Sequence, residues 1–322
     1  MPSVVSIAGG KQDCHVASTT VVEAARRALG PVGVFLPFSR TSAPSADLQR
    51  EAVRRLERAG YRATWTNEAV GGKDALVQLA VLLAATERMV FGTAIANIWA
   101  RPPQTAQGAA ALLAQAFPDR FVLGLGVGYP HQAASVGRRY GSPVATMRDY
   151  LDRMPGPTQL PAPDVDYPKI IGANGPRMLA LAGESADGAM PAMVPPEFTT
   201  QARQLLGPDK LLAVGLAVVA DADPARAKAD ARQRVADRLG QPGTYAATMA
   251  RLGYSEREIS QVSDRLVDGI VGYGDAAAIA AKVRMHLNAG ADHVMVMSTA
   301  TELDDGVEQL EQLAPTLAGL TS

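Results

Sequence analysis

Residues 119–128 read DRFVLGLGVG, an apolar run that ends in three glycines spaced two apart. Near-continuous apolar runs of this length are typical of parallel strands that are covered on both faces. Because glycine has no Cβ, a ligand or another backbone can approach positions 124, 126 and 128 closely. Ligands of parallel α/β proteins bind at the carboxyl ends of the strands. The run therefore predicts a strand that points at a binding site, with a strand that only packs tightly as the alternative.

Strand-like and helix-like segments alternate on both sides of this run. Further strands are expected at residues 32–37, 62–66, 89–97, 169–173, 188–192, 211–220 and 292–297. Helices follow them, and Ser45 and Asp275 stand where helix N-caps are expected. Eight alternating units predict an α/β fold of the TIM (β/α)8 barrel type with short insertions. The alternative is an open doubly wound sheet, but neither its phosphate-binding glycine loop nor its dinucleotide fingerprint is present.

The barrel is expected to span residues 31–322, with a helical insertion at about 240–274 that reads as two short helices. Residues 1–30 precede the alternating pattern. They are predicted to form an N-terminal extension that could be flexible, with one short helix that ends at Leu29.

Composition and charge narrow the classes of partner and site. The 322 residues carry a net charge of −1, which argues against nucleic acid and against an anionic membrane as the main partner. Cys14 is the only cysteine and the four histidines stand far apart, so neither an intrachain disulfide nor a metal site is predicted. The N-terminus lacks a signal-peptide pattern, and no 18-residue apolar run follows it. We therefore expect a cytoplasmic protein with a small-molecule substrate.

Several polar and aromatic side chains follow the predicted strands and are candidates for the site. Glu68 follows the second strand and is a candidate general acid or base, with a solvated loop glutamate as the alternative. His131 follows the glycine run and could bind substrate or move a proton, although a lone loop histidine is more often inert. Trp99 and Arg101 follow the third strand and suit a flat ligand held by stacking and hydrogen bonds, unless Trp99 only packs under its loop. Together with Phe38 after the first strand, they are expected to contact substrate.

The stretch NGPRM at residues 174–178 reads as a turn from a strand into a helix. Its glycine frees the backbone, and proline suits the first helical position. The unpaired N–H groups of a helix N-terminus bind anions, and Arg177 adds a cation. We expect an anion or phosphate site here, with an ordinary capped helix start as the alternative.

Three motifs together carry a resemblance to a known family. The stretches GTAIANIWAR at 92–101, FPDRFVLGLG at 117–126 and GANGPRM at 172–178 resemble, in order and spacing, the bacterial luciferase-like flavin oxidoreductases. The branch that uses coenzyme F-420, a deazaflavin, is the most similar. LVD at 266–268 and GADHV at 290–294 are also similar to that branch.

The resemblance implies a TIM barrel with the deazaflavin at the carboxyl ends of the strands, and a homodimer that pairs through barrel helices. It implies a non-prolyl cis peptide bond at Ala94–Ile95 against the ring, with Asn97 beside the ring. Trp65 and Glu68 would border the ring and the substrate. The ribityl chain and phosphate would be held by two further groups of residues, Val127, Gly128 and Tyr129 in one, and Asn174, Gly175, Arg177 and Met178 in the other.

The sequence also departs from relatives that oxidise sugar phosphates. Those relatives place Asp-His after strand two and Glu after strand four, where this chain has Glu68-Ala69 and Tyr129. Glucose-6-phosphate chemistry is therefore not expected. The sequence predicts an F-420-dependent oxidoreductase that transfers a hydride between the cofactor and a small organic substrate. The alternatives are an FMN-dependent monooxygenase, a non-catalytic deazaflavin-binding or carrier protein, and a barrel that binds no flavin.

Overall fold

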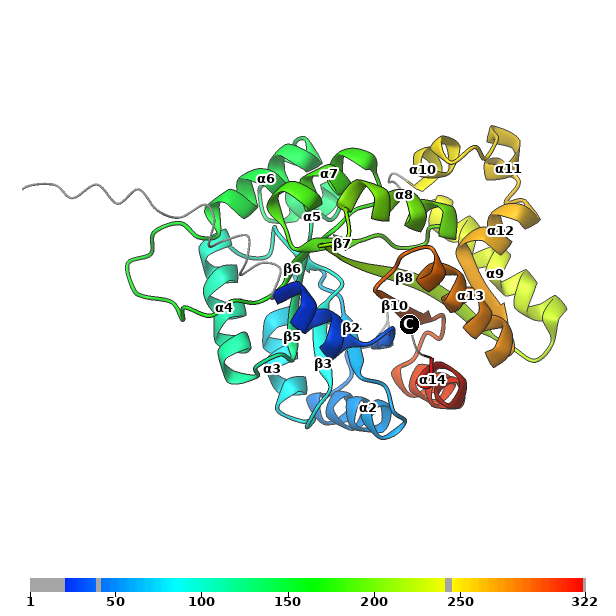
Figure 1. The fold of residues 1–322 in the computed structure, drawn as a ribbon, viewed down its shortest axis with the longest axis horizontal. Coiled ribbons are helices and arrows are strands. Elements are labelled where there is room, and N and C mark those ends of the chain that lie inside the picture. Colours follow the sequence, from blue (N-terminus) through cyan, green and yellow to red (C-terminus); the bar gives the residue numbers. More distant parts are fainter. Residues whose placement is uncertain (1–20, 39–41, 241–244, 321–322) are drawn as a thin grey trace, which may run out of the picture.

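The computed structural model describes residues 21–38, 42–240 and 245–320, and its centre is a closed barrel of parallel strands (Figure 1). Neighbouring strands pair in chain order, and the last strand pairs with both the first strand and β8. The predicted TIM barrel is thereby confirmed. Its strands are β1 (Val32–Phe35), β2 (Ala63–Thr66), β3 (Val90–Thr93), β5 (Phe121–Gly126), β6 (Lys169–Gly172), β7 (Gly188–Met190), β8 (Leu211–Ala220) and β10 (His293–Ser298).

Helices surround the barrel on all sides in Figure 1. The side chains of Ser45 and Asp275 accept hydrogen bonds from Leu48 N and Ala278 N, which confirms both predicted N-caps. No helix in the described ranges is long and apolar enough to cross a membrane. The surrounding helices are α2 (Ala46–Arg58), α3 (Ala75–Leu83), α4 (Pro103–Ala116), α5 (Pro130–Ser135), α6 (Pro143–Arg153), α7 (Pro176–Ser185), α8 (Pro196–Leu206), α9 (Pro224–Leu239), α13 (Ala276–Asn288) and α14 (Leu303–Leu317).

A further helix, residues 21–29, precedes the barrel and covers the end where the strands begin. Its buried side chains join those of the barrel interior in one apolar cluster, which includes Val22, Leu29, Phe35, Trp65, Val122 and Met295. The described part of the predicted N-terminal extension is therefore packed against the barrel. Residues 1–20 lie outside the described residues.

The insertion after α9 differs from its prediction. Its two expected helices are present as α10 (Tyr245–Arg251) and α11 (Glu256–Ser260). A third helix, α12 (Asp264–Ile270), and a strand, β9 (Val271–Gly274), were missed. β9 has only four residues, two of them glycine, and it pairs with the second half of β8 beyond the reach of three-residue β7. Figure 1 shows α10 to α12 at the periphery, and residues 241–244 are not described.

Candidate active site at the barrel mouth

The expected third strand is interrupted at the barrel mouth, the rim formed by the carboxyl ends of the strands. β3 ends at Thr93, and β4 (Ala96–Asn97) continues beside β5. Between them the Ala94–Ile95 peptide bond is cis, as the resemblance implied. Both residues are half-buried, so this bulge presents an apolar surface at the mouth.

The glycines of β5 make room for the bulge. A Cβ at Gly124 would lie 1.9 Å from the carbonyl oxygen of Thr93, and a Cβ at Gly126 would lie 2.4 Å from Cγ1 of Ile95. Thr93 Oγ1 also donates to Gly124 O at 2.7 Å. The close approach predicted from the glycine run is confirmed, and it brings the bulge onto the backbone of β5.

Asn97 is buried beside the bulge, and its side chain is held from two sides. Its Oδ1 accepts from Trp99 N at 3.0 Å, and its Nδ2 donates to Gln132 Oε1 at 3.1 Å. The same oxygen of Gln132 accepts from Tyr129 N at 2.9 Å, so Gln132 joins the bulge to the end of β5. Sequence reasoning missed Gln132, although a glutamine at the third position of a helix that begins with Pro130 is a capping signal.

Glu68 lies in the loop after β2, and its carboxylate has no free lone pair. Oε1 accepts from Ala75 N at 2.9 Å and from Arg101 Nη2, while Oε2 accepts from Asn97 N at 2.8 Å and from Arg101 Nη1 at 3.1 Å. A carboxylate offers about four acceptor sites, and here all four are used. The side chain is 1% exposed. This geometry corrects the expectation of proton transfer, because Glu68 instead fixes the start of α3 and the bulge.

Arg101 is committed to the same network. Its guanidinium pairs with Glu68 and also with Asp74 at 2.8 Å, and its side chain is 7% exposed. The expectation that Arg101 binds substrate is therefore corrected, since its donors already face two carboxylates. Asp74 also caps α3 by accepting from Leu76 N and Val77 N.

Trp65 lies inside the barrel rather than at the mouth. The residue is fully buried, and a Cβ at Gly92 would lie 2.2 Å from its ring. Its Nε1 donates to His293 Nε2 at 3.0 Å, and His293 sits at the start of β10. The expected contact between Trp65 and a cofactor ring is corrected, because the alternating side chains of β2 turn this indole into the core.

Trp99 packs under its loop and against the end of β5. Its Nε1 donates to Val127 O at 2.8 Å, and its ring lies 6.1 Å from that of Tyr140. Tyr140 donates to Gly128 O at 3.1 Å, so the carbonyls of Val127 and Gly128 are already engaged. Trp99 also lines a surface cleft of about 600 Å³ together with Arg138, Arg139, Gly141, Ala145, Thr146 and Asp149.

Tyr129, which follows β5, is linked to the insertion through hydrogen bonds of Arg238. Its hydroxyl accepts from Arg238 Nη2 at 2.8 Å, and Arg238 also donates to Tyr245 OH at 2.7 Å. The exposed ring of His131 stacks on Tyr129 with 5.7 Å between centroids. Phe38, at the end of β1, is 38% exposed and meets Phe35 edge to face.

The start of α7 gathers cations around a backbone without a side-chain cap. Gly175 is the N-cap, Pro176 follows, and Arg177 is exposed. From α10, Arg251 places Nη2 at 3.4 Å from Asn174 O and 3.7 Å from where a Gly175 Cβ would lie. The expectation that Met178 holds the cofactor is corrected, because its side chain is buried in the main core. Arg251 was missed because 77 residues separate it from Asn174 along the chain.

Asn174 itself serves the barrel. Its side chain donates to Ala192 O and accepts from Ala192 N, both at 3.0 Å. Its carbonyl accepts from Thr248 Oγ1 at 2.8 Å. Asn174 therefore anchors the turn, and the cations beside it are the groups that face solvent.

Lys73 is a mouth residue that sequence reasoning also missed. The residue is exposed overall, but its Nζ donates to Thr66 Oγ1 at 3.2 Å, at the end of β2. Loss of surrounding water lowers the pKa of Lys73 to about 8, and the charge of Glu68 opposes only part of that shift. Its only sequence signal is its place in a Gly-Gly-Lys loop, directly before the Asp74 cap.

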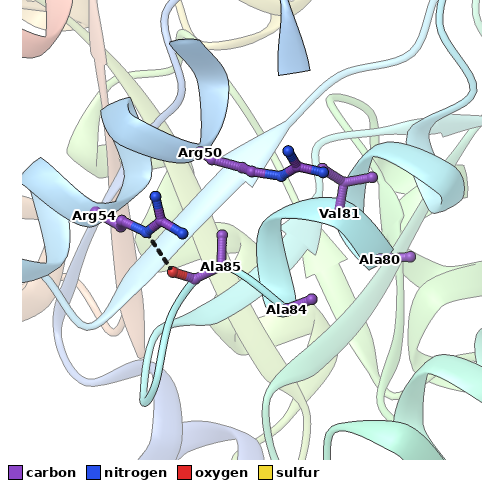
Figure 2. Close-up of a pocket in the computed structure, with 6 residues that line it drawn as sticks. All are labelled: Arg50, Arg54, Ala80, Val81, Ala84 and Ala85. Carbon is purple, nitrogen blue, oxygen red and sulfur yellow. Dashed lines mark hydrogen bonds between the residues drawn. The ribbon is translucent and has the colours of Figure 1, made fainter. Parts of the chain in front are cut away.

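The helix layer carries a further groove outside the mouth. A groove between α2 and α3, lined by Arg50, Arg54, Ala80, Val81, Ala84 and Ala85, lies on the outside of the helices (Figure 2). It reaches past the end of α3, away from the strand carboxyl ends, so it does not belong to the mouth. Within the described ranges no group of three or more His, Cys, Asp or Glu side chains could hold a metal ion.

Comparison with known proteins gives one family match. The model of a family described as luciferase-like monooxygenase matches residues 31–293. A Mycobacterium tuberculosis protein named "Putative coenzyme F420-dependent oxidoreductase" is 31% identical over 180 residues. That match covers 46% of this chain and 52% of the relative, so the chain spans about half the length of this relative.

Two solved structures share the fold at low sequence identity. An F420-dependent secondary alcohol dehydrogenase, in complex with an F420-acetone adduct, has a TM-score of 0.69 at 15% identity, covering 89% of this chain and 99% of that one. The oxygenating constituent of 3,6-diketocamphane monooxygenase from Pseudomonas putida, in complex with FMN, has a TM-score of 0.68 at 15% identity. This second match covers 90% of this chain and 97% of the monooxygenase chain. Both similarities concern the fold alone. The dehydrogenase is described with an adduct of F420, a deazaflavin, and the monooxygenase is described with FMN, a flavin.

Proposed function

This chain belongs to the luciferase-like monooxygenase family of oxidoreductases, and from that membership we propose that it transfers a hydride between coenzyme F-420 and a small organic substrate. The observation that carries the proposal is the start of α7, where an uncapped helix N-terminus meets the exposed guanidinium groups of Arg177 and Arg251. The relative named for coenzyme F420 supports the choice of cofactor.

The chemistry of these donors fits the phosphate of such a cofactor. Unpaired N–H groups at a helix N-terminus and guanidinium groups are both strong partners for phosphate oxygens. Arg251 already points toward the turn through Asn174 O and Thr248 Oγ1. In this proposal Gly175, Arg177 and Arg251 hold the phosphate.

The bulge fits the ring of the cofactor. Ala94 and Ile95 offer a half-buried apolar surface, and the hydrogen bonds of Asn97, Gln132 and Glu68 fix it in place. When bound, the cofactor supplies a carbon that accepts or gives a hydride. The side chains of the protein hold the ring in one orientation and exclude water from the side that rests on the bulge.

The first experiment is a fluorescence titration of the purified chain with F-420 and, separately, with FMN. Tight binding of F-420 and weak binding of FMN are expected. The FMN-bound structure with the same fold makes a monooxygenase the second candidate. Tight FMN binding with oxygen uptake by the reduced complex would favour that candidate, and F-420 binding without turnover of any substrate would favour a carrier.

The same titration tests the phosphate contacts. Changing Arg177 or Arg251 to Ala should weaken F-420 binding about 10- to 100-fold each, because a charge-assisted hydrogen bond contributes about 1.5–3 kcal/mol. Arg148→Ala is a suitable control, since Arg148 pairs with Glu184 at the opposite end of α7. Unchanged affinity in both the Arg177 and the Arg251 variant would contradict the assignment of the phosphate to the start of α7.

We also propose that the chain forms a homodimer through the outer faces of α3 and α4. Neither helix contains a charged residue, and Val77 and Leu112 on their outer faces are 65% and 57% exposed. α3 is apolar on its whole exposed surface, and such a helix is normally covered. The two helices lie next to each other in the outer layer (Figure 1), so a second copy can cover them together.

A further inference from the structure

The cleft lined by Trp99 opens beside the barrel mouth. Trp99 follows β4, and its Nε1 donates at 2.8 Å to the carbonyl of Val127, the residue after β5. The cleft continues along the loop before α6 and the first two turns of α6. Its volume of about 600 Å³ lies within the range of about 300–1,000 Å³ that small-molecule sites occupy. The cleft is therefore large enough for a ligand of its own.

The indole ring of Trp99 is fixed at this cleft. The backbone N of Trp99 donates to Asn97 Oδ1 at 3.0 Å, and its ring nitrogen is bonded to Val127 O. The ring lies 6.1 Å from that of Tyr140, at an interplanar angle of 44°. Because the one polar atom of the indole already has a partner, the half-buried ring offers the cleft a flat apolar surface in one orientation. Such a surface suits a planar ligand that stacks on it.

Two consecutive guanidinium groups line the same cleft. Arg138 and Arg139 are exposed, and within the described ranges neither side chain forms a hydrogen bond or an ion pair. Asp149 is the one acid among the described lining residues, and it pairs with Arg153 at 3.3 Å, one turn further along α6. The lining thus combines two cations whose donors are unused with one carboxylate that already has a partner. This charge favours an anionic ligand.

The start of α6 adds positive potential to the cleft. The helix has 11 residues, and Ala145 and Thr146 of its first turn line the cleft. The N-cap Ser142 accepts from Ala145 N at 3.5 Å, which is longer than the usual N–H···O distance of about 2.9–3.0 Å. The first N–H groups of a helix carry the positive end of its dipole and attract anions. Two independent sources of positive charge therefore meet beside one flat ring.

We propose that this cleft binds a planar organic acid, with its ring on Trp99 and its carboxylate against Arg138 and Arg139. A guanidinium can donate two parallel N–H bonds to one carboxylate, so the fork of either arginine matches the acid group. A small inorganic anion would leave the ring of Trp99 unused, and a neutral aromatic compound would leave the arginines unused. The inference goes beyond the proposed hydride transfer and does not depend on it, because the cleft shares no lining residue with the start of α7.

The first test measures binding to the full-length chain without cofactor by isothermal titration calorimetry. The probe is naphthalene-2-carboxylate. Its neutral amide, which keeps the ring without the charge, and acetate, which keeps the charge without the ring, are the comparison compounds. The probe should bind at least about tenfold more tightly than either of them. Equal affinity of the amide or of acetate, or no binding of the probe at about 1 mM, would overturn the proposal.

The second test changes the guanidinium groups. The double variant Arg138→Gln, Arg139→Gln should lower the affinity for the probe at least about tenfold, because both charged contacts are lost. Both side chains are exposed, so the variant should keep the melting temperature of the wild type. The matched control is Arg50→Gln, Arg54→Gln, since these arginines line the groove of Figure 2, which has no aromatic ring. The control should bind the probe as the wild type does, and an equal loss in both double variants would overturn the proposal.

The third test changes the ring. Trp99→Leu should weaken binding of the probe at least about threefold, because the stacking surface is lost. Binding of acetate should not change. A folded Trp99→Leu variant that binds the probe as tightly as the wild type would contradict the stacking role of the indole and overturn the proposal.

A titration with F-420 separates this cleft from the cofactor site. The double variant Arg138→Gln, Arg139→Gln should bind F-420 within about twofold of the wild type, because its changes lie outside the start of α7. A loss of F-420 affinity as large as the loss for the probe would assign the cleft to the cofactor and overturn a separate site. A wild-type chain that binds the probe but not F-420 would overturn the proposed function and support this inference.

Discussion

Single side chains at the barrel mouth differ in how far their polar atoms are already committed. Glu68 and Arg101 face each other and use their acceptors and donors within the protein. Lys73, by contrast, donates to Thr66 Oγ1 and lies in no ion pair within the described ranges. A carboxylate whose four acceptor sites are all occupied is held in one position, whereas an ammonium that donates one hydrogen bond keeps two N–H groups for other partners.

Glu68→Gln tests the positioning role of this carboxylate. The amide NH2 of Gln is a donor, and it would replace one oxygen that now accepts from Ala75 N, Asn97 N or Arg101. The guanidinium of Arg101 would also lose its buried negative partner. We expect the free energy of unfolding to fall by about 3 kcal/mol, as measured by urea denaturation. Glu184→Gln, which breaks an exposed pair with Arg148, should cost about 0.5 kcal/mol or less. Wild-type stability of Glu68→Gln together with lost turnover would return Glu68 to proton transfer.

Position along the sequence located the mouth but not the direction of each side chain. Glu68, Tyr129 and Asn174 do follow strand ends, and Asn97 is the last residue of β4. Trp65 is only one residue before the end of β2, yet the alternation of a strand turns it into the barrel. The partners of Glu68 come from loops up to 33 residues away, and a single sequence does not show such pairings.

The helix over residues 21–29 illustrates how one element closes the barrel. It ends at Leu29 and is followed by Gly30, whose φ of +65° favours glycine. The carbonyl of Gly30 accepts from His293 Nδ1 at 2.7 Å, and His293 Nε2 accepts from Trp65 Nε1. Because a carbonyl only accepts and an indole N–H only donates, His293 is held as the neutral tautomer with its proton on Nδ1.

The stability of the protein should therefore depend on His293 as the pH falls. Burial lowers the pKa of His293 to about 4, whereas the unfolded chain takes up this proton near pH 6.5. Between these values only the unfolded state binds the proton, so the free energy of unfolding decreases as the pH falls and levels off below about pH 4. The loss from this group is on the order of 3 kcal/mol. Urea unfolding of wild type and His293→Gln at pH 7, 5.5 and 4.5 measures it.

The comparison of the two proteins isolates His293 from other groups. Burial also lowers the pKa of His286, to about 3, so this histidine lowers the free energy of unfolding in the same direction as the pH falls. His286 is present in both proteins, and its effect cancels from the comparison. The difference between wild type and His293→Gln should therefore shrink as the pH falls from 7 to 4.5. A difference that stays constant with pH would show that His293 does not resist protonation.

Element prediction succeeded where pattern and length agreed. Seven of the barrel strands were expected close to their observed bounds, and the eighth was expected as one strand where the structure has β3 and β4 around the cis bond. The failures share a cause, because α12 and β9 are short and glycine-containing, and their place is set by pairing with β8. Tertiary contacts rather than local pattern specify such segments.

The molecule as a whole has an uneven surface charge. Over residues 75–83 and 103–116 the helices α3 and α4 carry no charge, whereas α9 carries seven charged side chains in 16 residues. The groove of Figure 2 borders this uncharged face and adds Arg50 and Arg54 from α2 to its rim. Interfaces that form stable homodimers are depleted of charge at their centre and polar at their rim.

Charge reversal at the centre of this face should separate the two copies. In light scattering after gel filtration, the wild-type chain should have twice its single-chain mass of 33.7 kDa. Val77→Glu and Leu112→Glu should give the single-chain mass, because burying an unpaired carboxylate at an interface costs several kcal/mol. Both sites are exposed, so the free energy of unfolding of each variant should lie within about 0.5 kcal/mol of the value for the dissociated wild-type chain. Leu205→Glu on α8, at a site that is 52% exposed, is the control and should remain dimeric. A wild-type chain that is monomeric at micromolar concentration, or a control that dissociates as readily as the two variants, would remove α3 and α4 as the interface.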